Sequence, residues 1–326
     1  METILKVENL KIGLIEKKGI AYPVKDVSFE IKKGETFALV GESGSGKSMT
    51  SLCIMGLLQS WNSFRSPKIT GTIDYTAKDR KHYDLTTLGE KEYDKLRGFD
   101  MGIIFQEPLT ALNPVVSVGK QIMEVILAHE NVTREEAKAR ALDLLNQVEI
   151  PDAERRFDAF PHQFSGGQLQ RIVIAMAIAC NPNLLIADEP TTALDVTIQK
   201  QILLLLKKLQ KQYGMTILII THDLAVVSEF ADKVAVMYSG HMVETGTVQQ
   251  IFKKPEHPYT EMLISSIPTL DTIPGTRLVT KDDFLFGSGH AERAKLFAPE
   301  QEGEIRTQIV EEGHYVSTVF MREAAA

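Results

Sequence analysis

The sequence predicts an α/β fold, with helices layered on a mostly parallel sheet and a small C-terminal extension after it. Strand-like segments at both ends of the chain flank a helical block near residues 107–180. One apolar segment, 36–40, ends in a Gly/Ser cluster that opens a helical stretch. Alternation of strands and helices is typical of such layered folds, and the block between them indicates a helical insertion.

The strands follow from hydrophobic patterns. Val27, Phe29 and Ile31 alternate with the polar Ser28 and Glu30, which predicts a half-exposed strand. Short and mostly apolar segments bounded by polar or turn residues are typical of more deeply buried strands. We predict the remaining strands at 36–40, 71–75, 101–105, 184–187, 215–220 and 234–237.

The helices are predicted from periodicity and from their start signals. The clearest start is Thr133, because Glu136 three residues later completes a capping box. Residues 76–98 are polar, and we expect a loop with one short helix there. The helices are predicted at 47–58, at 167–180, at 197–213 and, as a pair, within 117–148.

The C-terminal part differs in character from the rest. After about Lys254 the strand and helix patterns fade, and residues 271–326 contain many Pro and Gly. Such a composition favours turns. We therefore expect a small, turn-rich appendage that is not part of the parallel sheet.

Composition excludes several classes of protein. The 326 residues are 44% hydrophobic, with 36 Lys and Arg against 43 Asp and Glu and a net charge of −7. Such a chain can bury a core, and it lacks the basic field that a mainly nucleic-acid-binding protein needs.

The only cysteines, Cys53 and Cys180, lie in apolar stretches and read as buried residues in a reducing compartment. The sequence opens without a signal-peptide pattern, and its longest apolar run, 172–180, is far shorter than the about 20 residues of a membrane span. We expect a cytoplasmic protein.

Residues 41–48, GESGSGKS, match the pattern G-x-x-x-x-G-K-[ST]. The match follows an apolar strand and opens a helix, which is the context that phosphate binding requires. Glycines let backbone N–H groups turn toward phosphate oxygens, and the helix N-terminus adds its dipole. We expect Lys47 to reach the β- and γ-phosphates and the Ser48 hydroxyl to bind Mg²⁺. The predicted ATP-binding residues are Gly41, Glu42, Ser43, Gly44, Ser45, Gly46, Lys47, Ser48 and Met49.

The strand at 184–187 ends in Asp188 and Glu189. A carboxylate at the tip of a strand beside a phosphate loop suits Mg²⁺, which is the role predicted for Asp188. Glu189 would then position or polarise the attacking water. Alone, a strand that ends in two acids is common; the phosphate loop upstream favours the functional interpretation.

Ser165, Gly166, Gly167 and Gln168 combine a turn with a helix start. Backbone donors here could bind a second phosphate group. A simple N-cap, with Ser165 capping Gln168, explains the same residues equally well. The pattern alone leaves both interpretations open.

Taken in order, these motifs resemble the ABC ATPase family over about residues 3–268. The resemblance adds Gln106 after a strand, Asp195 as the D-loop and His222 after the strand 215–220. It implies a P-loop NTPase cassette with a RecA-like core, an antiparallel β subdomain and a helical subdomain insertion at about 107–180. The implied domains are a nucleotide-binding domain, 1–254, and a C-terminal extension, 255–326.

The resemblance also implies roles. In this family two cassettes pair head to tail and sandwich two ATP molecules, so Ser165, Gly166, Gly167 and Gln168 would reach the nucleotide of the partner. Tyr22 is the candidate for stacking on adenine. The implied catalytic residues are Glu189, His222 and Gln106, and the implied magnesium ligands are Ser48, Gln106 and Asp188.

The segments 41–48, 105–114, 257–263 and 265–268 are similar to the dipeptide/oligopeptide importer branch, and specifically to its D-type ATPase. The resemblance implies ATP and Mg²⁺, a second and different ATPase subunit, two transmembrane permease subunits, an extracytoplasmic peptide-binding protein and a place on the cytoplasmic face of the membrane, with no nucleic acid bound. Many members carry C-terminal cysteines, some holding an iron–sulfur cluster; no cysteine follows Cys180 here, so we expect no cluster. Two alternatives stay open: an importer of nickel or metal–chelator complexes from the same branch, and a soluble ABC ATPase of translation or DNA repair.

Overall fold

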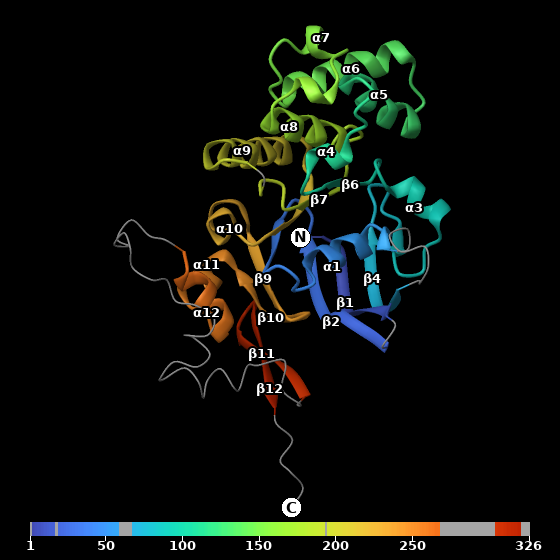
Figure 1. The fold of residues 1–326 in the computed structure, drawn as a ribbon. Helices are drawn as coiled ribbons and strands as arrows, with labels where there is room; N and C mark the ends of the chain where they lie inside the picture. The colour runs from blue at the N-terminus through green and yellow to red at the C-terminus, as the bar shows by residue number, and fades with distance from the viewer. Residues whose placement is uncertain (1, 17–18, 59–66, 193, 268–303, 321–326) are drawn as a thin grey trace, which may run out of the picture.

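The computed structural model describes residues 2–16, 19–58, 67–192, 194–267 and 304–320. Two sheets occupy one half of the molecule and a group of helices the other (Figure 1). The helical group consists of α4 (Pro108–Ala111), α5 (Val118–His129), α6 (Arg134–Gln147), α7 (Ala153–Arg156) and α8 (Gly166–Ala177). Layers of helix and sheet were expected, and the structure has them. The division into domains at 107–180 and 254 stays a prediction.

The main sheet is mixed, with strand order β11-β12-β10-β9-β3-β8-β7-β6 in the described part of the chain. The four strands from β3 to β6 in this order, together with β9, are parallel, and β10, β12 and β11 continue the sheet with antiparallel pairings. The strands are β3 (Thr36–Val40), β6 (Met101–Ile104), β7 (Leu184–Asp188), β8 (Thr216–Thr221), β9 (Lys233–Tyr238), β10 (His241–Thr247), β11 (Glu304–Glu311) and β12 (His314–Phe320).

The two faces of the parallel strands belong to two different cores. On β8, Leu218 and Ile220 pack into a cluster shared with the second sheet, whereas Ile217 and Ile219 pack into a cluster shared with the helices. Successive side chains of a strand point to opposite faces, so strands covered on both sides are apolar throughout. This is why the predicted strand at 215–220 is apolar at every position except Thr216.

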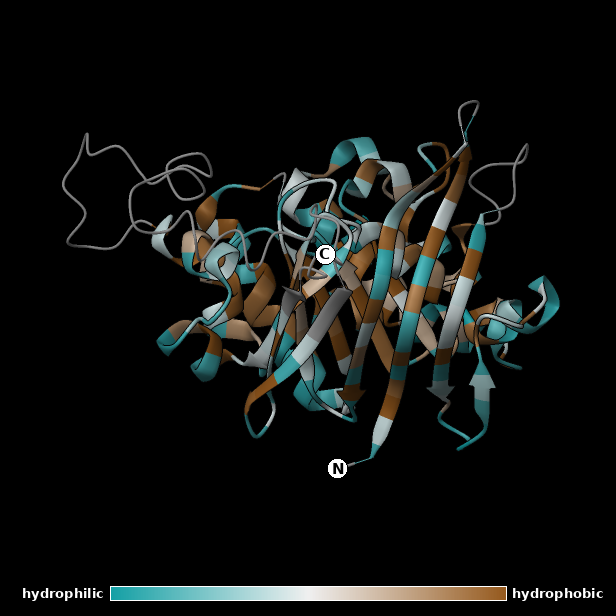
Figure 2. Cartoon of the chain, turned by 90° about the horizontal axis from the view of Figure 1, so that it is seen from below, coloured by the Kyte–Doolittle hydropathy of each residue, from teal (hydrophilic) through white to brown (hydrophobic). Residues whose placement is uncertain are grey.

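The second sheet is antiparallel, with order β2-β1-β4-β5. Its strands show alternating apolar and polar bands in Figure 2, as a sheet with one exposed face requires. Phe29 of this sheet stacks on Phe37 of β3 with ring centroids 5.1 Å apart, so the two sheets share one core. The strands are β1 (Thr3–Glu16), β2 (Gly19–Lys32), β4 (Lys68–Thr76) and β5 (His82–Asp84).

Several helix boundaries follow local chemistry. The predicted capping box is present, with Thr133 Oγ1 accepting from the Glu136 N–H and the Glu136 side chain accepting from the Thr133 N–H. The helix expected at 47–58 ends earlier, at Ile54, and Gly56 behind it has φ 66°, a left-handed conformation that favours glycine and ends helices. The other helices are α1 (Lys47–Ile54), α3 (Glu90–Leu96), α9 (Val196–Tyr213), α10 (Leu224–Phe230), α11 (Val248–Lys253) and α12 (Pro258–Ser265).

The C-terminal strands bear on one expectation. We expected an appendage that is not part of the parallel sheet; β12 pairs antiparallel with β10, so the hairpin β11–β12 continues the mixed sheet beyond its parallel strands. The physical reason is a buried pair: the imidazole of His314 on β12 lies 2.8 Å from the carboxylate of Glu244 on β10, and neither side chain is exposed to solvent. Residues 268–303 of the appendage lie outside the described residues.

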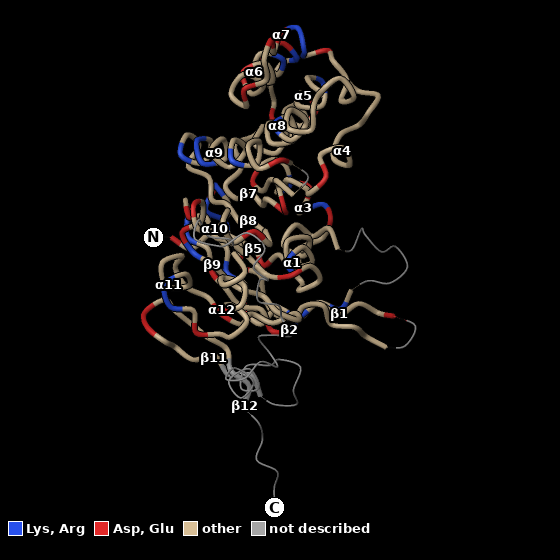
Figure 3. Tube along the Cα trace, turned by 60° about the vertical axis from the view of Figure 1, so that its left-hand side comes forward, with Lys and Arg blue, Asp and Glu red and all other residues tan. Residues whose placement is uncertain are grey.

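Charged side chains of both signs are interspersed along the described chain (Figure 3). No helix in the described ranges has both the length and the apolar composition needed to cross a bilayer. The longest helix, α9, instead lies with one apolar face on the core.

We predict that Leu206→Ala lowers the free energy of unfolding by about 2–5 kcal/mol, because Leu206 on α9 is fully buried and its truncation leaves a cavity. The matched control is Leu204→Ala on the same helix. That side chain is 59% exposed, and its loss should change stability by no more than about 0.5 kcal/mol. Urea unfolding of both variants measures the difference; equal losses would contradict the packing of α9.

Candidate nucleotide site

A pocket of about 690 Å³ opens where the parallel strands β3, β7 and β8 end. Ligands of open α/β sheets bind at this edge, because the loops that follow the strands meet there. Most of the predicted ATP-binding and catalytic residues line it, together with three that we did not predict. The lining residues are Pro23, Gly41, Glu42, Ser43, Gly44, Gly46, Lys47, Ser48, Met49, Gln106, Glu189, Thr192, His222 and Leu263.

The loop between β3 and α1 needs glycine at two of its positions. Gly41 has φ 151°, and a Cβ there would lie 2.2 Å from the carbonyl oxygen of Met237. Gly46 has φ 106°, and a Cβ there would lie 2.5 Å from the carbonyl oxygen of Pro23. Both contacts are with backbone, so no larger residue fits without moving a neighbouring strand. The glycines therefore hold the loop tight against β9 and β2.

Lys47 begins α1 and turns its ammonium back into the loop. Its Nζ donates to the carbonyl oxygens of Gly41 and Glu42, both at 2.8 Å, and to Ser45 Oγ at 3.4 Å. The side chain is buried, and burial lowers the pKa of Lys47 from its ordinary value, with the nearby carboxylates of Glu189 and Asp188 opposing the shift. The loop thus encloses a cation at its centre.

Ser48, which lines the pocket, pairs with Asp188, which is not among the lining residues. Ser48 Oγ donates to Asp188 Oδ1 at 3.0 Å, and Ser51 Oγ donates to Asp188 Oδ2 at 3.3 Å. Burial raises the pKa of Asp188, and the two hydroxyl hydrogen bonds oppose the shift. A hydroxyl and a carboxylate side by side are hard oxygen donors of the kind that Mg²⁺ prefers, so these residues fit that ion.

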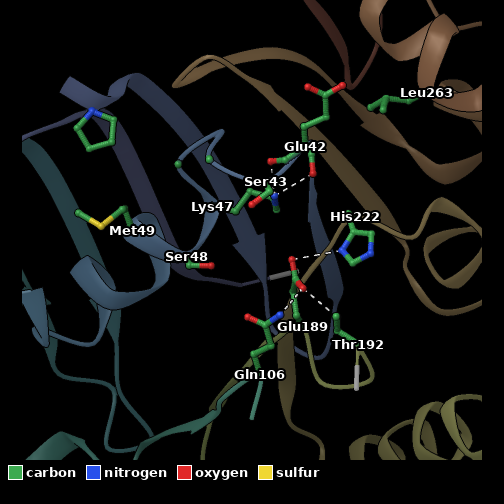
Figure 4. A pocket seen from close by; sticks show the side chains of 14 residues that line it. Glu42, Ser43, Lys47, Ser48, Met49, Gln106, Glu189, Thr192, His222 and Leu263 are labelled. Atoms are coloured by element: carbon green, nitrogen blue, oxygen red, sulfur yellow. Dashed lines mark hydrogen bonds and ion pairs between the residues drawn. The ribbon is translucent and has the colours of Figure 1, made fainter. Parts of the chain in front are cut away.

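Glu189 lies at the centre of the polar side of the pocket (Figure 4). Its Oε2 accepts from Gln106 Nε2 at 3.1 Å and from Thr192 Oγ1 at 2.8 Å, and its Oε1 lies 3.3 Å from His222 Nδ1. The residue has φ 46°, an uncommon conformation for a side chain other than glycine. A strained backbone conformation of this kind persists where surrounding contacts hold it. Here three side chains from three loops contact the Glu189 carboxylate.

The predicted signature lies elsewhere. Residues 165–168 line a second pocket of about 580 Å³ with Asp195, and none of them lines the first pocket. The N-cap interpretation holds here: Ser165 Oγ accepts from the Gln168 N–H. Asp195 caps α9 in the same way, accepting from the N–H groups of Thr197 and Ile198. One chain therefore presents the phosphate loop and the signature as two separate surfaces.

The contact of Tyr22 with adenine stays a prediction. Tyr22 is not among the residues that line the pocket; its neighbour Pro23 is. The ring instead packs against Gly13, with Lys11 Nζ 4.2 Å from its centroid.

Four contributors escaped the sequence analysis, and one of them is Pro23 of β2. Thr192 follows Glu189 by one helical turn's spacing, which could have suggested a contact. Leu263 and Tyr259 come from α12, and Tyr259 Oη accepts from the backbone N–H of Glu42 at 2.9 Å. No local pattern signals a contact between residues more than 200 positions apart.

Two family models match the chain. Residues 24–192, more than half of the chain, match the family described as ABC transporter. Residues 243–281 match the family described as oligopeptide/dipeptide transporter, C-terminal region. The second match begins in β10 and includes α11 and α12.

Relatives of known name agree with both models. The oligopeptide transport ATP-binding protein AppD of Bacillus subtilis (strain 168) is 52% identical over 271 residues, 83% of this chain and 80% of AppD. The dipeptide transport ATP-binding protein DppD of the same organism is 51% identical over 272 residues, 83% of this chain and 78% of DppD. The glutathione import ATP-binding protein GsiA of Escherichia coli (strain K12) is 49% identical over 273 residues, 83% of this chain and 43% of GsiA.

Solved structures confirm the expected cassette fold. The dimeric post-hydrolysis state of the ATP-binding cassette MJ0796, bound to ADP and Pi, superposes with a TM-score of 0.65 at 30% identity. It covers 75% of this chain and 99% of that one. CbiO1 of Clostridium perfringens, part of the ABC transporter complex cbiONQ, gives a TM-score of 0.64 at 31% identity, with 79% of this chain and 94% of that chain covered. The chain belongs to the ABC transporter family of ATP-binding proteins, in the branch that contains the oligopeptide and dipeptide transport ATP-binding proteins.

Proposed function

We propose that this chain is the ATP-hydrolysing, energy-coupling subunit of a membrane importer for oligopeptides or dipeptides. The observation that carries the proposal is the arrangement of Glu189: its carboxylate is held by Gln106, Thr192 and His222 in the same pocket as the phosphate loop. The names of the relatives support peptides as cargo. We infer a place on the cytoplasmic face of the membrane, beside two permease subunits and an extracytoplasmic peptide-binding protein.

Phosphate binding would use the loop as it stands. Lys47 is already held at the loop's centre by carbonyl oxygens, so it needs only to exchange these acceptors for phosphate oxygens. Ser48 and Asp188 would hold Mg²⁺, assisted by Gln106. The ion, when bound, neutralises charge on the phosphates and orients them.

Hydrolysis would depend on Glu189 as the general base. Its carboxylate can accept a proton from a water that it aligns, and hydrogen bonds from Gln106 and Thr192 fix the direction in which the oxygens point. His222, 54% exposed beside Glu189, is placed to contact the terminal phosphate and keep the water in line. The chemistry is therefore mostly positioning and charge stabilisation.

A second cassette would complete each site. Ser165 and Gly166 are exposed, and they lie outside the pocket of their own chain. The first N–H groups of α8 have no partner within the helix, and its dipole favours an anion. We infer that this surface contacts the γ-phosphate held by a partner cassette, which is a different chain in a heterodimer of ATPases.

We predict that Glu189→Gln lowers ATP hydrolysis about 100-fold or more while ATP still binds, because the amide cannot take the proton from water. Nucleotide binding and phosphate release measure the two steps. Glu124→Gln, at an exposed position on α5, serves as the control and should leave both unchanged. Normal turnover in Glu189→Gln would contradict the assignment of the base.

The same Glu189→Gln variant tests the transporter assignment. We expect tagged variant, purified from solubilised membranes with ATP and Mg²⁺, to retain a second ATPase, two permease subunits and a peptide-binding protein. Recovery of a nickel- or chelate-binding protein would replace the peptide assignment. Recovery of ribosomal or DNA-repair components without permeases would contradict a role in transport.

Ser165→Arg should impair hydrolysis at the partner's nucleotide, because a long cationic side chain would occupy the space of the terminal phosphate. ATP binding in this chain's own pocket should not change. Ser228→Arg is the matched control, since Ser228 is exposed on α10 and lines neither the nucleotide pocket nor the pocket at residues 165–168. Single-turnover hydrolysis in the two-ATPase assembly measures the effect; full activity in Ser165→Arg would contradict completion across chains.

Asp188→Asn should raise the thermal unfolding midpoint of the nucleotide-free protein at pH 7. The pKa of Asp188 is raised in the folded state by burial, so its ionisation opposes folding above the unfolded pKa of about 3.9. Below the raised pKa the difference should shrink, and it should vanish below the unfolded pKa of about 3.9, where the carboxyl is protonated in both states. A pH series of melts measures this, with the exposed Asp158→Asn as control. A lower midpoint at pH 7 would show that the carboxylate stabilises the apo fold.

A further inference from the structure

We propose that Tyr259, on the helix α12 that follows the cassette core, is a positioning residue for the phosphate loop. Its hydroxyl holds the peptide unit that joins Gly41 to Glu42, and this peptide in turn holds Lys47. Glu244, His314 and two backbone N–H groups at the start of α12 hold this helix in place. The inference rests on the proposed function, since it assigns to this loop the binding of ATP.

The contact brings the C-terminal helix to the site. Tyr259 Oη accepts a hydrogen bond from the Glu42 N–H at 2.9 Å, and the side chain is only 6% exposed. Leu263, four residues further along α12, lines the nucleotide pocket. Residues four apart share one face of a helix, so α12 turns one face toward the phosphate loop.

Both ends of one peptide unit are held. Its N–H donates to Tyr259 Oη, and its C=O, that of Gly41, accepts from Lys47 Nζ at 2.8 Å. Rotation of the peptide would break both hydrogen bonds together. Gly41 has φ 151° and no side chain to restrain it, so the orientation of this peptide depends on such partners.

The phenol is held on its own side by packing. The ring of Tyr259 lies 4.5 Å, centroid to centroid, from the ring of Tyr238 on β9. Burial raises the pKa of Tyr259, so its hydroxyl stays neutral. The neutral phenol oxygen therefore accepts the backbone N–H of Glu42 without adding a charge near the Lys47 ammonium.

The N-terminus of α12 is fixed by a buried carboxylate. Glu244 accepts from the backbone N–H groups of Glu256 at 2.8 Å and His257 at 3.0 Å, and from His314 on β12 at 2.8 Å. His257 Nδ1 then accepts from the Tyr259 N–H at 3.1 Å. Contacts therefore run without a break from the C-terminal hairpin through α12 to Lys47.

Tyr259→Phe tests the proposal, because it removes one oxygen and keeps the ring that packs on Tyr238. We expect the KM for ATP in the assembled transporter to rise about 3- to 10-fold, the effect of one lost hydrogen bond, while kcat changes less than about 2-fold. Tyr93→Phe is the matched control. Tyr93 is 5% exposed, and its hydroxyl donates to the carbonyl of Leu85, outside the pocket lining.

A second readout needs no nucleotide. Amide hydrogen exchange of the full chain should be faster at Glu42 in Tyr259→Phe and unchanged there in Tyr93→Phe. An unchanged KM together with unchanged exchange would overturn the proposal. Lys47→Ala distinguishes failure of the proposed function from failure of the role of Tyr259. If Lys47→Ala binds ATP normally, the proposed function is wrong. If Lys47→Ala loses ATP binding while Tyr259→Phe behaves as wild type, only the role of Tyr259 is wrong.

Discussion

Parallel pairing of β6, β7, β8 and β3 places the residues that follow these strands at one edge of the sheet, and each side chain of the candidate site depends on this register. Val40 pairs with Thr221, and Asp188 pairs with Ile220. The loop after Val40, the acids that end β7 and the histidine after Thr221 are thereby brought within hydrogen-bonding reach. A slip of one residue in β7 would turn Asp188 to the other face of the sheet. The apolar faces of the strands, packed into two separate cores, prevent that slip.

Burial gives the pocket an electrostatic cost that a ligand can remove. Lys47 and Asp188 are both largely removed from solvent. Burial lowers the pKa of Lys47 and raises the pKa of Asp188, and both shifts favour the uncharged side chain. Opposite charges nearby offset this only in part. A phosphate beside Lys47 and a divalent cation beside Asp188 would supply the missing counter-charges. The site is thus less stable empty than filled, as functional sites commonly are.

Features that depend on neighbouring residues could be predicted from the sequence, and features that depend on distant ones could not. The phosphate loop, the acids after β7 and the capping box at Thr133 are each local patterns. The role of Tyr22 stays a prediction, because its position before the loop is visible in the sequence whereas the face of β2 on which it lies is not. Pairing of β12 with β10, and the buried pair of His314 with Glu244, join segments about 70 residues apart. No periodicity in either segment predicts which strand it pairs with.

The position of the signature residues supports the inference that a second cassette completes the site. The capping and phosphate-binding interpretations of Ser165 were alternatives in the sequence, yet the structure makes them compatible. The serine oxygen accepts from the Gln168 N–H, while Gly166, the first residue of α8, is exposed and its N–H has no partner within the helix. A cap that fixes the first turn also aims those donors, because it holds the helix start in one conformation. Since this surface lies apart from the chain's own phosphate loop, an anion bound there would come from another molecule. A second cassette in a head-to-tail arrangement would supply that anion, and its own signature would contact the nucleotide bound to this chain.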